Sequence, residues 1–235
     1  MNYIKMSPIV GMSGYGGGAT ALPFSGVGSI PIVNGGDRAF TAGGETSGAI
    51  EEIEFITIST PGNATDFGNL TDSRSFGAGS ANATGRALFW GFMQNQPQID
   101  YITTTSTSSA SDFGDMQNSR GLGAAASSGT RGLYFGGRGG GTGGYNSNEV
   151  DYVTIANTGN GTDFGNLTHP VEAFCGTGNA DRSLTFGGYD HDNGQTKRGN
   201  IDYFDPSSTG NASDFGDMVT GGRIQHFQQL MLYVL

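Results

Sequence analysis

The chain has 235 residues, of which 43 are glycine and only 14% are charged, and its formal net charge is −10. This length is enough to bury a core, whereas an acidic chain poor in Lys and Arg disfavours binding to nucleic acid or to anionic membranes. The single cysteine excludes an internal disulfide and a cysteine zinc site. Aromatic residues make up 11% of the chain and recur at fixed intervals, so we interpret the glycines as turns of an all-β protein rather than as disorder.

A repeat of about 47 residues organises the chain. The tripeptide Asp-Phe-Gly, always preceded by Ser or Thr, begins at Asp66, Asp112, Asp163 and Asp214, so that the spacings are 46, 51 and 51 residues. Twelve positions before each Phe lies another aromatic residue: Phe55, Tyr101, Tyr152 and Tyr203. Because this interval is constant in four copies, the chain is predicted to consist of repeated supersecondary units.

Each unit is predicted to contain three strands. The first begins at an Arg, at residues 38–40, 86–90, 131–135 and 182–186, and three of the four copies continue into Gly-Gly while the second has only Gly91. The next strand carries the aromatic residue and spans 53–57, 99–103, 150–154 and 201–204, all rich in β-branched side chains. A third strand of small residues follows Asp-Phe-Gly, as at 73–79 and 121–126. The chain shows no sustained 3.6-residue period, so helix content should be very low.

The repeat predicts a five-bladed β-propeller. The four complete units are residues 38–85, 86–130, 131–181 and 182–222. Residues 3–6 and 20–24 resemble the aromatic strand and the Asp-Phe segment, and residues 230–235 resemble the strand that precedes Gly-Gly. We therefore expect a single domain, 1–235, whose fifth blade is shared by residues 1–37 and 223–235. Ring closure removes free sheet edges; an open β-solenoid is the competing arrangement.

The repeated residues are interpreted as structural. The Asp of each tripeptide should accept backbone N–H bonds in a turn, the Phe should fill the space between blades, and the Gly should allow a positive φ. The repeated Arg38, Arg86, Arg131 and Arg182 are predicted to form blade-joining ion pairs with Asp or Glu of a neighbouring strand.

Two family resemblances follow from these motifs. Gly136-Gly137, Tyr152 and Phe164 resemble a kelch-type propeller repeat, although kelch repeats carry a Trp about six residues after the Tyr and this chain carries a Phe at twelve. The run from Asp151 to Thr168 is more similar to the kelch-like repeat proteins of tailed marine bacteriophages, and the likeness covers about residues 38–220. This resemblance implies a virion structural protein of the tail, a fibre or the capsid surface, and it implies no catalytic residues.

The sequence offers no constellation for catalysis, a cofactor or a metal, so the chain is expected not to be an enzyme. The three histidines are scattered, and Asp190-His191-Asp192-Asn193-Gly194 lacks the distal Glu of a calcium loop, which leaves a weak surface calcium site as a minor alternative. Variable loops carry function more often than conserved strands do. The longer loops, 138–148 and 189–200, therefore mark a candidate binding face with Tyr145, Tyr189 and His191.

We expect a non-enzymatic phage virion component that acts in assembly or host attachment; the alternative is a carbohydrate-binding, lectin-like propeller. Other virion proteins would be its partners, together with a host-surface glycan in the attachment role, and several copies would join a larger assembly. The first ten residues lack the features of a signal peptide, and no run approaches 18 apolar residues. Synthesis in the host cytoplasm and residence in the phage particle, without membrane insertion, are therefore expected.

Overall fold

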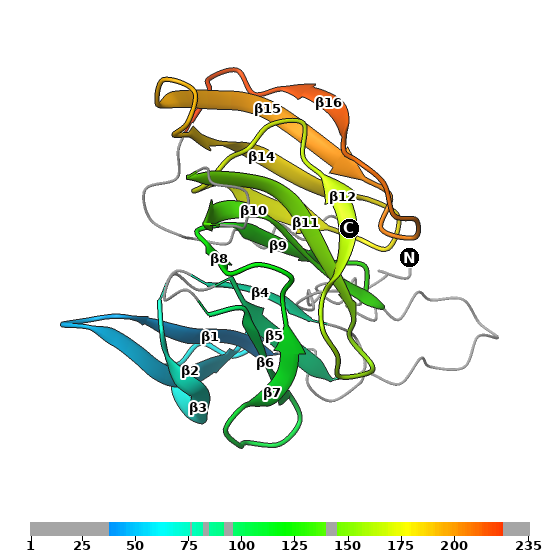
Figure 1. Ribbon diagram of the computed structural model, residues 1–235. Helices are drawn as coiled ribbons and strands as arrows, with labels where there is room; N and C mark the ends of the chain where they lie inside the picture. The colour runs from blue at the N-terminus through cyan, green and yellow to red at the C-terminus, as the bar shows by residue number, and fades with distance from the viewer. Residues whose placement is uncertain (1–37, 76, 82–84, 92–95, 140–144, 223–235) are drawn as a thin grey trace, which may run out of the picture.

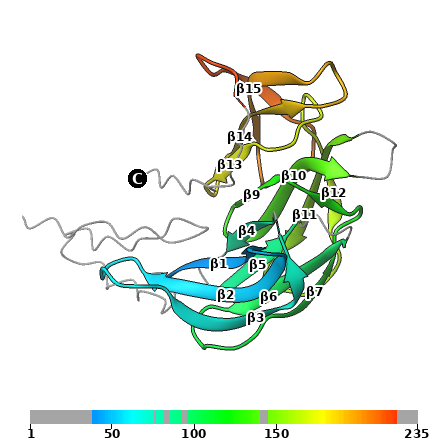
Figure 2. The same cartoon turned by 90° about the vertical axis from the view of Figure 1, so that its left-hand side faces the viewer.

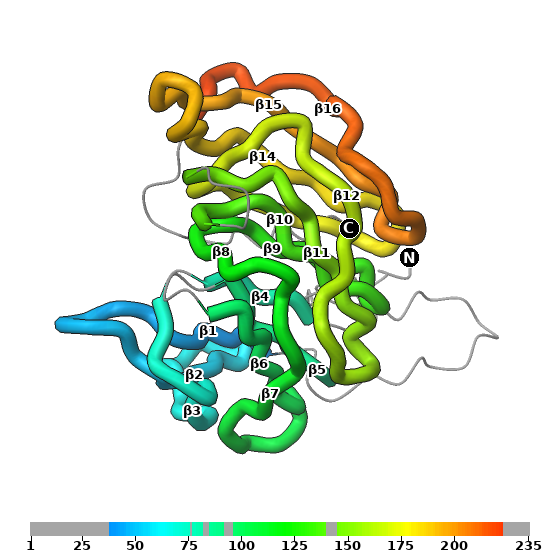
Figure 3. Tube along the Cα trace, viewed as in Figure 1, coloured from blue at the N-terminus to red at the C-terminus, as the bar shows by residue number. Residues whose placement is uncertain are grey.

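The computed structural model describes residues 38–75, 77–81, 85–91, 96–139 and 145–222, and in these ranges the chain forms sixteen strands and no helix (Figure 1). The all-β expectation is therefore confirmed. The strands form four separate sheets, named A to D in chain order. All pairings are antiparallel and join consecutive strands, except that β8 and β9 both pair with β10, and the chain completes one sheet before it begins the next (Figure 3).

The strands of each sheet are listed in chain order. Sheet A contains β1 (Arg38–Glu45), β2 (Ala49–Thr57) and β3 (Thr65–Arg74). Sheet B contains β4 (Ala78–Ala81), β5 (Arg86–Trp90), β6 (Gln98–Thr103) and β7 (Ser111–Asp115). Sheet C contains β8 (Arg120–Gly121), β9 (Ala124–Ser127), β10 (Arg131–Gly139), β11 (Asn146–Thr154) and β12 (Thr162–Asn166). Sheet D contains β13 (Cys175–Gly178), β14 (Ser183–Asp190), β15 (Thr196–Phe204) and β16 (Ser213–Asp217).

The small-residue strands pair with the strand that follows them. β4 pairs with β5, β9 with β10, and β13 with β14. A hydrogen-bonded sheet therefore begins before the small-residue strand, whereas the sequence units 38–85, 86–130 and 131–181 each end after it. The physical reason is proximity along the chain, because only a short turn separates each small-residue strand from the next Arg strand. Sheet A has no strand of this kind among the described residues.

Small residues allow adjacent sheets to approach at one side of the molecule. β4, β9 and β13 lie side by side on the concave side of an arc, and the outer strands β3, β7 and β12 lie on its convex side (Figure 2). A Cβ on Gly176 of β13 would lie only 3.1 Å from the Cβ of Ala124 in β9. A side chain at Gly176 would therefore push β13 and β9 apart.

The hydrophobic core lies between sheets rather than within one sheet. One cluster joins sheets A and B around Phe67 and Ile102, a second joins B and C around Phe113 and Ile155, and a third joins C and D. The Phe of Asp-Phe-Gly is 1% exposed at Phe67 and 2% exposed at Phe113. The prediction that this Phe fills the space between sheets is confirmed for these copies.

The Asp and Gly of the tripeptide lie in the outermost strand of each sheet, at a β-bulge, and not in a turn. In all four copies the Asp carboxylate accepts the backbone N–H of the Gly two residues later, at 2.9–3.1 Å. Gly165 has a φ of +141°, and a Cβ there would lie 2.3 Å from the carbonyl oxygen of Gly210 in sheet D. The positive φ was predicted, but the close approach of the next sheet is an equally strong reason for glycine.

Arg38, Arg86 and Arg131 donate to backbone carbonyls of the next sheet; among the described residues no ion pair joins Arg38 or Arg131 to an Asp or Glu, which corrects that prediction for these two. Arg38 donates to the carbonyl oxygen of Thr104 at 2.7 Å, and Arg131 donates to that of Pro206 at 2.9 Å. Arg86 does the same with the carbonyls of Ile155 and Ala156. Each guanidinium also lies 4.5–4.8 Å from the centre of the aromatic ring on the adjacent strand of its own sheet. The aromatic ring and the carbonyl oxygen both attract the guanidinium cation, so the cation is stabilised without a carboxylate.

Two other arginines form buried ion pairs near the junctions: Arg120 pairs within sheet C, and Arg74 of sheet A pairs with Asp100 of sheet B. Arg120 is fully buried and pairs with Asp151 at 3.1 Å and with Glu149, both on sheet C, where it fills the junction with sheet B. Arg74 occupies the same place at the junction of A and B and lies 3.7 Å from Asp100. Both arginines lie eight residues after the Asp of Asp-Phe-Gly. That shared spacing is the sequence signal that could have identified them.

Candidate functional site

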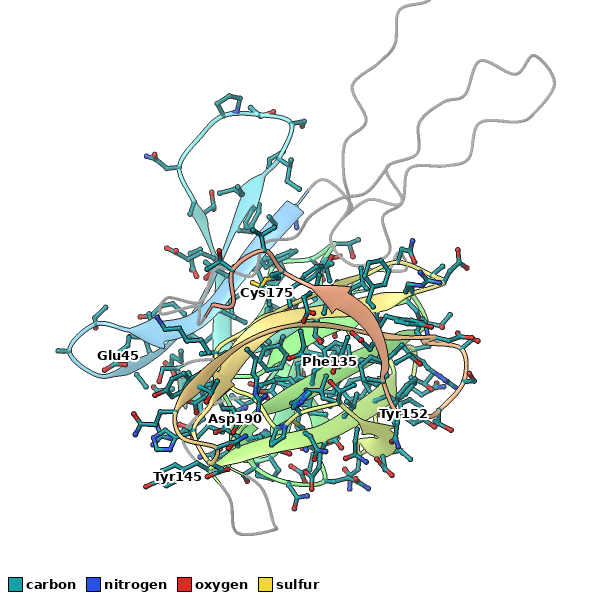
Figure 4. The ribbon with its side chains drawn as sticks, turned by 90° about the horizontal axis from the view of Figure 1, so that it is seen from above. Glu45, Phe135, Tyr145, Tyr152, Cys175 and Asp190 are labelled. Atoms are coloured by element: carbon teal, nitrogen blue, oxygen red, sulfur yellow. The ribbon has the colours of Figure 1, made fainter. Side chains whose placement is uncertain are left out.

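The candidate site is the rim where the β10–β11 and β14–β15 connections of sheets C and D meet. Figure 4 labels Tyr145 and Asp190 near one another at the edge of the molecule, whereas Phe135 lies among the packed side chains of the interior. The predicted loop residues Tyr145, Tyr189 and His191 come together here although they belong to different sheets. The ring centres of Tyr145 and His191 are 4.4 Å apart and stacked, and those of Tyr189 and His191 are 6.0 Å apart and edge-on.

Two polar side chains hold these rings in place: Asp192, which the sequence marked only within a possible calcium-binding segment, and Asn146, which the sequence did not single out. The Asp192 carboxylate accepts the backbone N–H groups of Tyr145 and Asn146 at 3.0 and 2.9 Å. Asn146 in turn accepts the N–H of His191 at 2.7 Å and donates to the carbonyl of Tyr189 at 3.1 Å. Two short polar side chains thus replace a regular sheet ladder between the two connections. No period or motif in the sequence indicates this role, because each acts on a backbone group that lies 43–47 residues away along the chain.

Charged groups surround this cluster, and the carboxylates are occupied by protein donors. Arg138 lies 5.2 Å from the ring centre of Tyr145, and its Nε lies 3.8 Å from the carboxylate of Glu172. The Asp190 carboxylate accepts Arg198 at 2.5 Å and the N–H of Asn193 at 3.0 Å. Across the described part of the chain, no three His, Cys, Asp or Glu side chains are grouped as a metal ion would require.

The exposed groups of the rim include an aromatic ring and a cation beside the exposed carboxylate of Asp192. Tyr145 is 53% exposed although its backbone is fixed by Asp192. A rigid, exposed tyrosine beside an arginine is typical of a contact surface, since such side chains give large contact area at low entropic cost. The geometry therefore suits recognition of a surface or a small ligand by stacking and hydrogen bonding.

The opposite rim of the same two sheets carries a shallow hollow of about 530 Å³. Its walls combine hydroxyl groups with the repeated arginine of sheet C: Ser128, Gly129, Thr130, Arg131, Ala180, Pro206 and Ser207. Because Arg131 is already bonded to the carbonyl of Pro206, we give this hollow less weight than the aromatic rim.

The Asp192 clamp should respond to pH. Its two backbone hydrogen bonds, first that from Asn146 and then that from Tyr145, lower the pKa of the Asp192 carboxyl from the ordinary 3.8. A carboxylate with a lowered folded-state pKa stabilises the rim above pH 3.8 and loses that effect as the pH falls through its folded pKa. In an NMR titration, the amide signals of Tyr145 and Asn146 are expected to shift together with a midpoint below 3.8. In the variant Asp192→Asn these two amide signals should no longer shift with pH. If they shift in the variant as they do in the wild type, the clamp is absent in solution.

Comparison of the sequence with protein-family models and with curated proteins yields no match. In the described residues, no helix is long and apolar enough to span a membrane.

Proposed function

We propose that this chain is a non-enzymatic structural protein of a bacteriophage particle, carried on the tail, a fibre or the capsid surface. The observation that supports this proposal most is that the repeated residues have structural roles. At the junctions between described sheets the Phe, Gly and Arg of the repeat contact the neighbouring sheet, and the Asp holds the bulge of its own strand, while the exposed Tyr145 lies on a rim outside the repeat. The phage source rests on the likeness of residues 151–168 to kelch-like phage repeats.

We also propose that the sheets are blades of a five-bladed, kelch-like propeller. Four antiparallel sheets follow one another along an arc, with their smallest strands on the concave side (Figure 2), as blades do around an axis. The closing blade would come from residues 1–37 and 223–235, which lie outside the described ranges. Such a particle-mounted ring would present its rims to other virion proteins and to the host surface, and several copies would be present in one assembly.

A lectin-like role is the second candidate, and the exposed Tyr145 beside Arg138 favours it. Sugar rings stack on aromatic side chains, and the cation and hydroxyls around them supply hydrogen bonds. A glycan could thus be the host-surface ligand of the virion protein, or binding could be the whole function.

Two measurements test these proposals together. Mass spectrometry of purified phage particles is expected to find the chain at a fixed number of copies; its absence from particles would contradict the virion proposal. A glycan array with the wild-type chain and Tyr145→Ala is expected to show binding that the variant loses if the rim recognises sugar. Lys197→Ala, an exposed change in strand β15, is the control and should bind as the wild type does.

A further inference from the structure

Three junctions between sheets follow one rule. The connection that precedes the Asp-Phe-Gly strand lies on the outer strand of the preceding sheet and donates backbone N–H groups to it. Gly159 donates to the carbonyl of Phe113 at 2.7 Å, and Gly210 donates to that of Phe164 at 2.7 Å. At the first junction Ala110 donates to the carbonyl of Asn69 at 2.7 Å.

Side chains of the later sheet complete each junction by accepting two N–H groups of the earlier sheet. The residue four before the Phe accepts the first of them: Ser109 from Asn69, Asn160 from Asp115 and Asn211 from Asn166. The Asp before the strand aromatic accepts the second: Asp100 from Thr71, Asp151 from Gln117 and Asp202 from Thr168. We call the outer strand of the earlier sheet, whose N–H groups bond these side chains, the donor edge. The surface of the later sheet that carries the accepting side chains is its acceptor face.

Sheet A has the acceptor face but no preceding sheet among the described residues. Ile56 is 43% exposed, whereas Ile102, Val153 and Phe204 at the same position are 1–3% exposed. Glu54 is exposed, although its counterparts Asp100, Asp151 and Asp202 are buried. Asn63 is the counterpart of Asn160 and Asn211, and all three are exposed.

Sheet D has the donor edge but no following sheet among the described residues. Phe215 is 53% exposed, whereas the other three Phe residues of the tripeptide are 1–2% exposed. A Cβ on Gly216 would meet nothing within 4 Å, although the same atom on Gly165 would overlap the next sheet. Arg182 keeps its ring contact with Tyr203, but the described residues give it no carbonyl like those that Arg38 and Arg131 bind.

We infer that the acceptor face of sheet A and the donor edge of sheet D are docking surfaces for residues 1–37 and 223–235 of the same chain. This inference rests on the proposed five-bladed ring and assigns its closing contacts. Along the sequence, residues 1–37 directly precede sheet A and residues 223–235 directly follow sheet D. Each segment is therefore adjacent in the chain to one of the two sheets with an uncovered surface. The pair Asn2-Tyr3 also repeats the acceptor-aromatic pair seen at Asp100-Tyr101, since an Asn oxygen can accept the same N–H group.

The contacts assigned to the closing sheet are specific. Asn63 accepts a backbone N–H from it, and Gly216 lies beneath one of its connections. The backbone N–H groups of Asp217 and Val219, the counterparts of Asn166 and Thr168, donate to its side chains.

Matched substitutions at internal and end positions test this inference in the full chain. If the surfaces are covered, Asn63→Ala lowers the Tm by ~2–4 °C, as expected for one hydrogen bond in a domain of this size, and Asn160→Ala does the same. Gly216→Ala is likewise expected to lower the Tm as much as Gly165→Ala. A silent Asn63→Ala, with Gly216→Ala clearly milder than Gly165→Ala, would overturn the inference. The Asn pair keeps the test decisive if Gly165→Ala does not fold.

Light scattering across protein concentration separates the chain's own segments from a second copy. A monomer with a concentration-independent Tm supports residues 1–37 and 223–235 as the occupants. A larger species whose Tm rises with concentration would overturn that assignment in favour of a second copy. Neither result depends on whether the chain is found in phage particles, so the functional proposal stands or falls separately.

Discussion

Arg120→Ala is expected to destabilise the protein by about 3–5 kcal/mol, because it leaves carboxylates without their cation at a buried junction. The Arg120 side chain is fully buried and Asp151 is 1% exposed. Burial raises the pKa of the Asp151 carboxyl, and the Arg120 guanidinium counteracts this. Removal of the guanidinium should therefore raise that pKa further. Urea denaturation at pH 7 measures the loss of stability.

The pH dependence of this variant has a definite sign. A carboxyl whose folded-state pKa is raised stabilises the fold below its unfolded pKa and loses that contribution as the pH rises through its folded pKa. The deficit of Arg120→Ala should accordingly be smaller at pH 5 than at pH 7. Lys197→Ala, an exposed control, should change stability by no more than about 0.5 kcal/mol. A loss for Arg120→Ala as small as that of the control would refute the role assigned to the buried pair.

The junction between sheets C and D supplies an internal comparison. Val171 stands there at the position of Arg120, and Thr168, at the position of Gln117, gives both its N–H and its hydroxyl to Asp202. Adding Gln117→Thr to Arg120→Val copies this arrangement into the junction of B and C. The double variant is expected to be more stable than Arg120→Ala, because the introduced Thr hydroxyl gives Asp151 a new donor.

Gly91→Ala is expected to cost about 2–4 kcal/mol, the sum of a left-handed backbone strain and an overpacked contact. Gly91 has a φ of +76°, and a Cβ there would lie 2.0 Å from the ring of Tyr134 in sheet C. Tyr134 is fully buried, and its hydroxyl accepts the N–H of Gly123 at 2.9 Å. The tyrosine therefore has no freedom to move away. Thermal denaturation followed by circular dichroism measures the cost.

A double-mutant cycle separates the two causes of that cost. In a Tyr134→Leu background the steric part should shrink, so Gly91→Ala should cost less there than in the wild type. Gly159→Ala, where a Cβ would meet nothing within 4 Å, should be nearly neutral. Equal costs in both backgrounds would show that the ring contact does not matter.

The strands could be predicted from the sequence because their signals are local. The run that contains Tyr152 and the run that contains Phe135 both carry dense β-branched or aromatic residues, and they form β11 and β10. The repeat also indicated which residues join sheets. It could not indicate the partners, because whether Arg131 binds a carboxylate or the carbonyl of Pro206 depends on how two sheets sit together. The same limit explains why the small-residue strands were grouped with the wrong neighbour.

At the candidate rim, too, the residue types could be predicted from the sequence but their tertiary partners could not. Loop length and side chains suited to stacking indicated Tyr145, Tyr189 and His191, and these three lie together in the structure. Asp192 was visible only as part of an acidic run. Its role, accepting two backbone N–H groups of another sheet, depends on tertiary geometry that no local pattern encodes.

Amide hydrogen exchange at Asp217 and Val219 tests the closed ring most directly. In sheet C the N–H groups of the corresponding residues, Asn166 and Thr168, are bonded to Asn211 and Asp202 of the next sheet. If a closing sheet follows sheet D, Asp217 and Val219 should exchange as slowly as Asn166 and Thr168 do. Exchange at the rate of an unstructured peptide would contradict closure and leave sheet D as an open end.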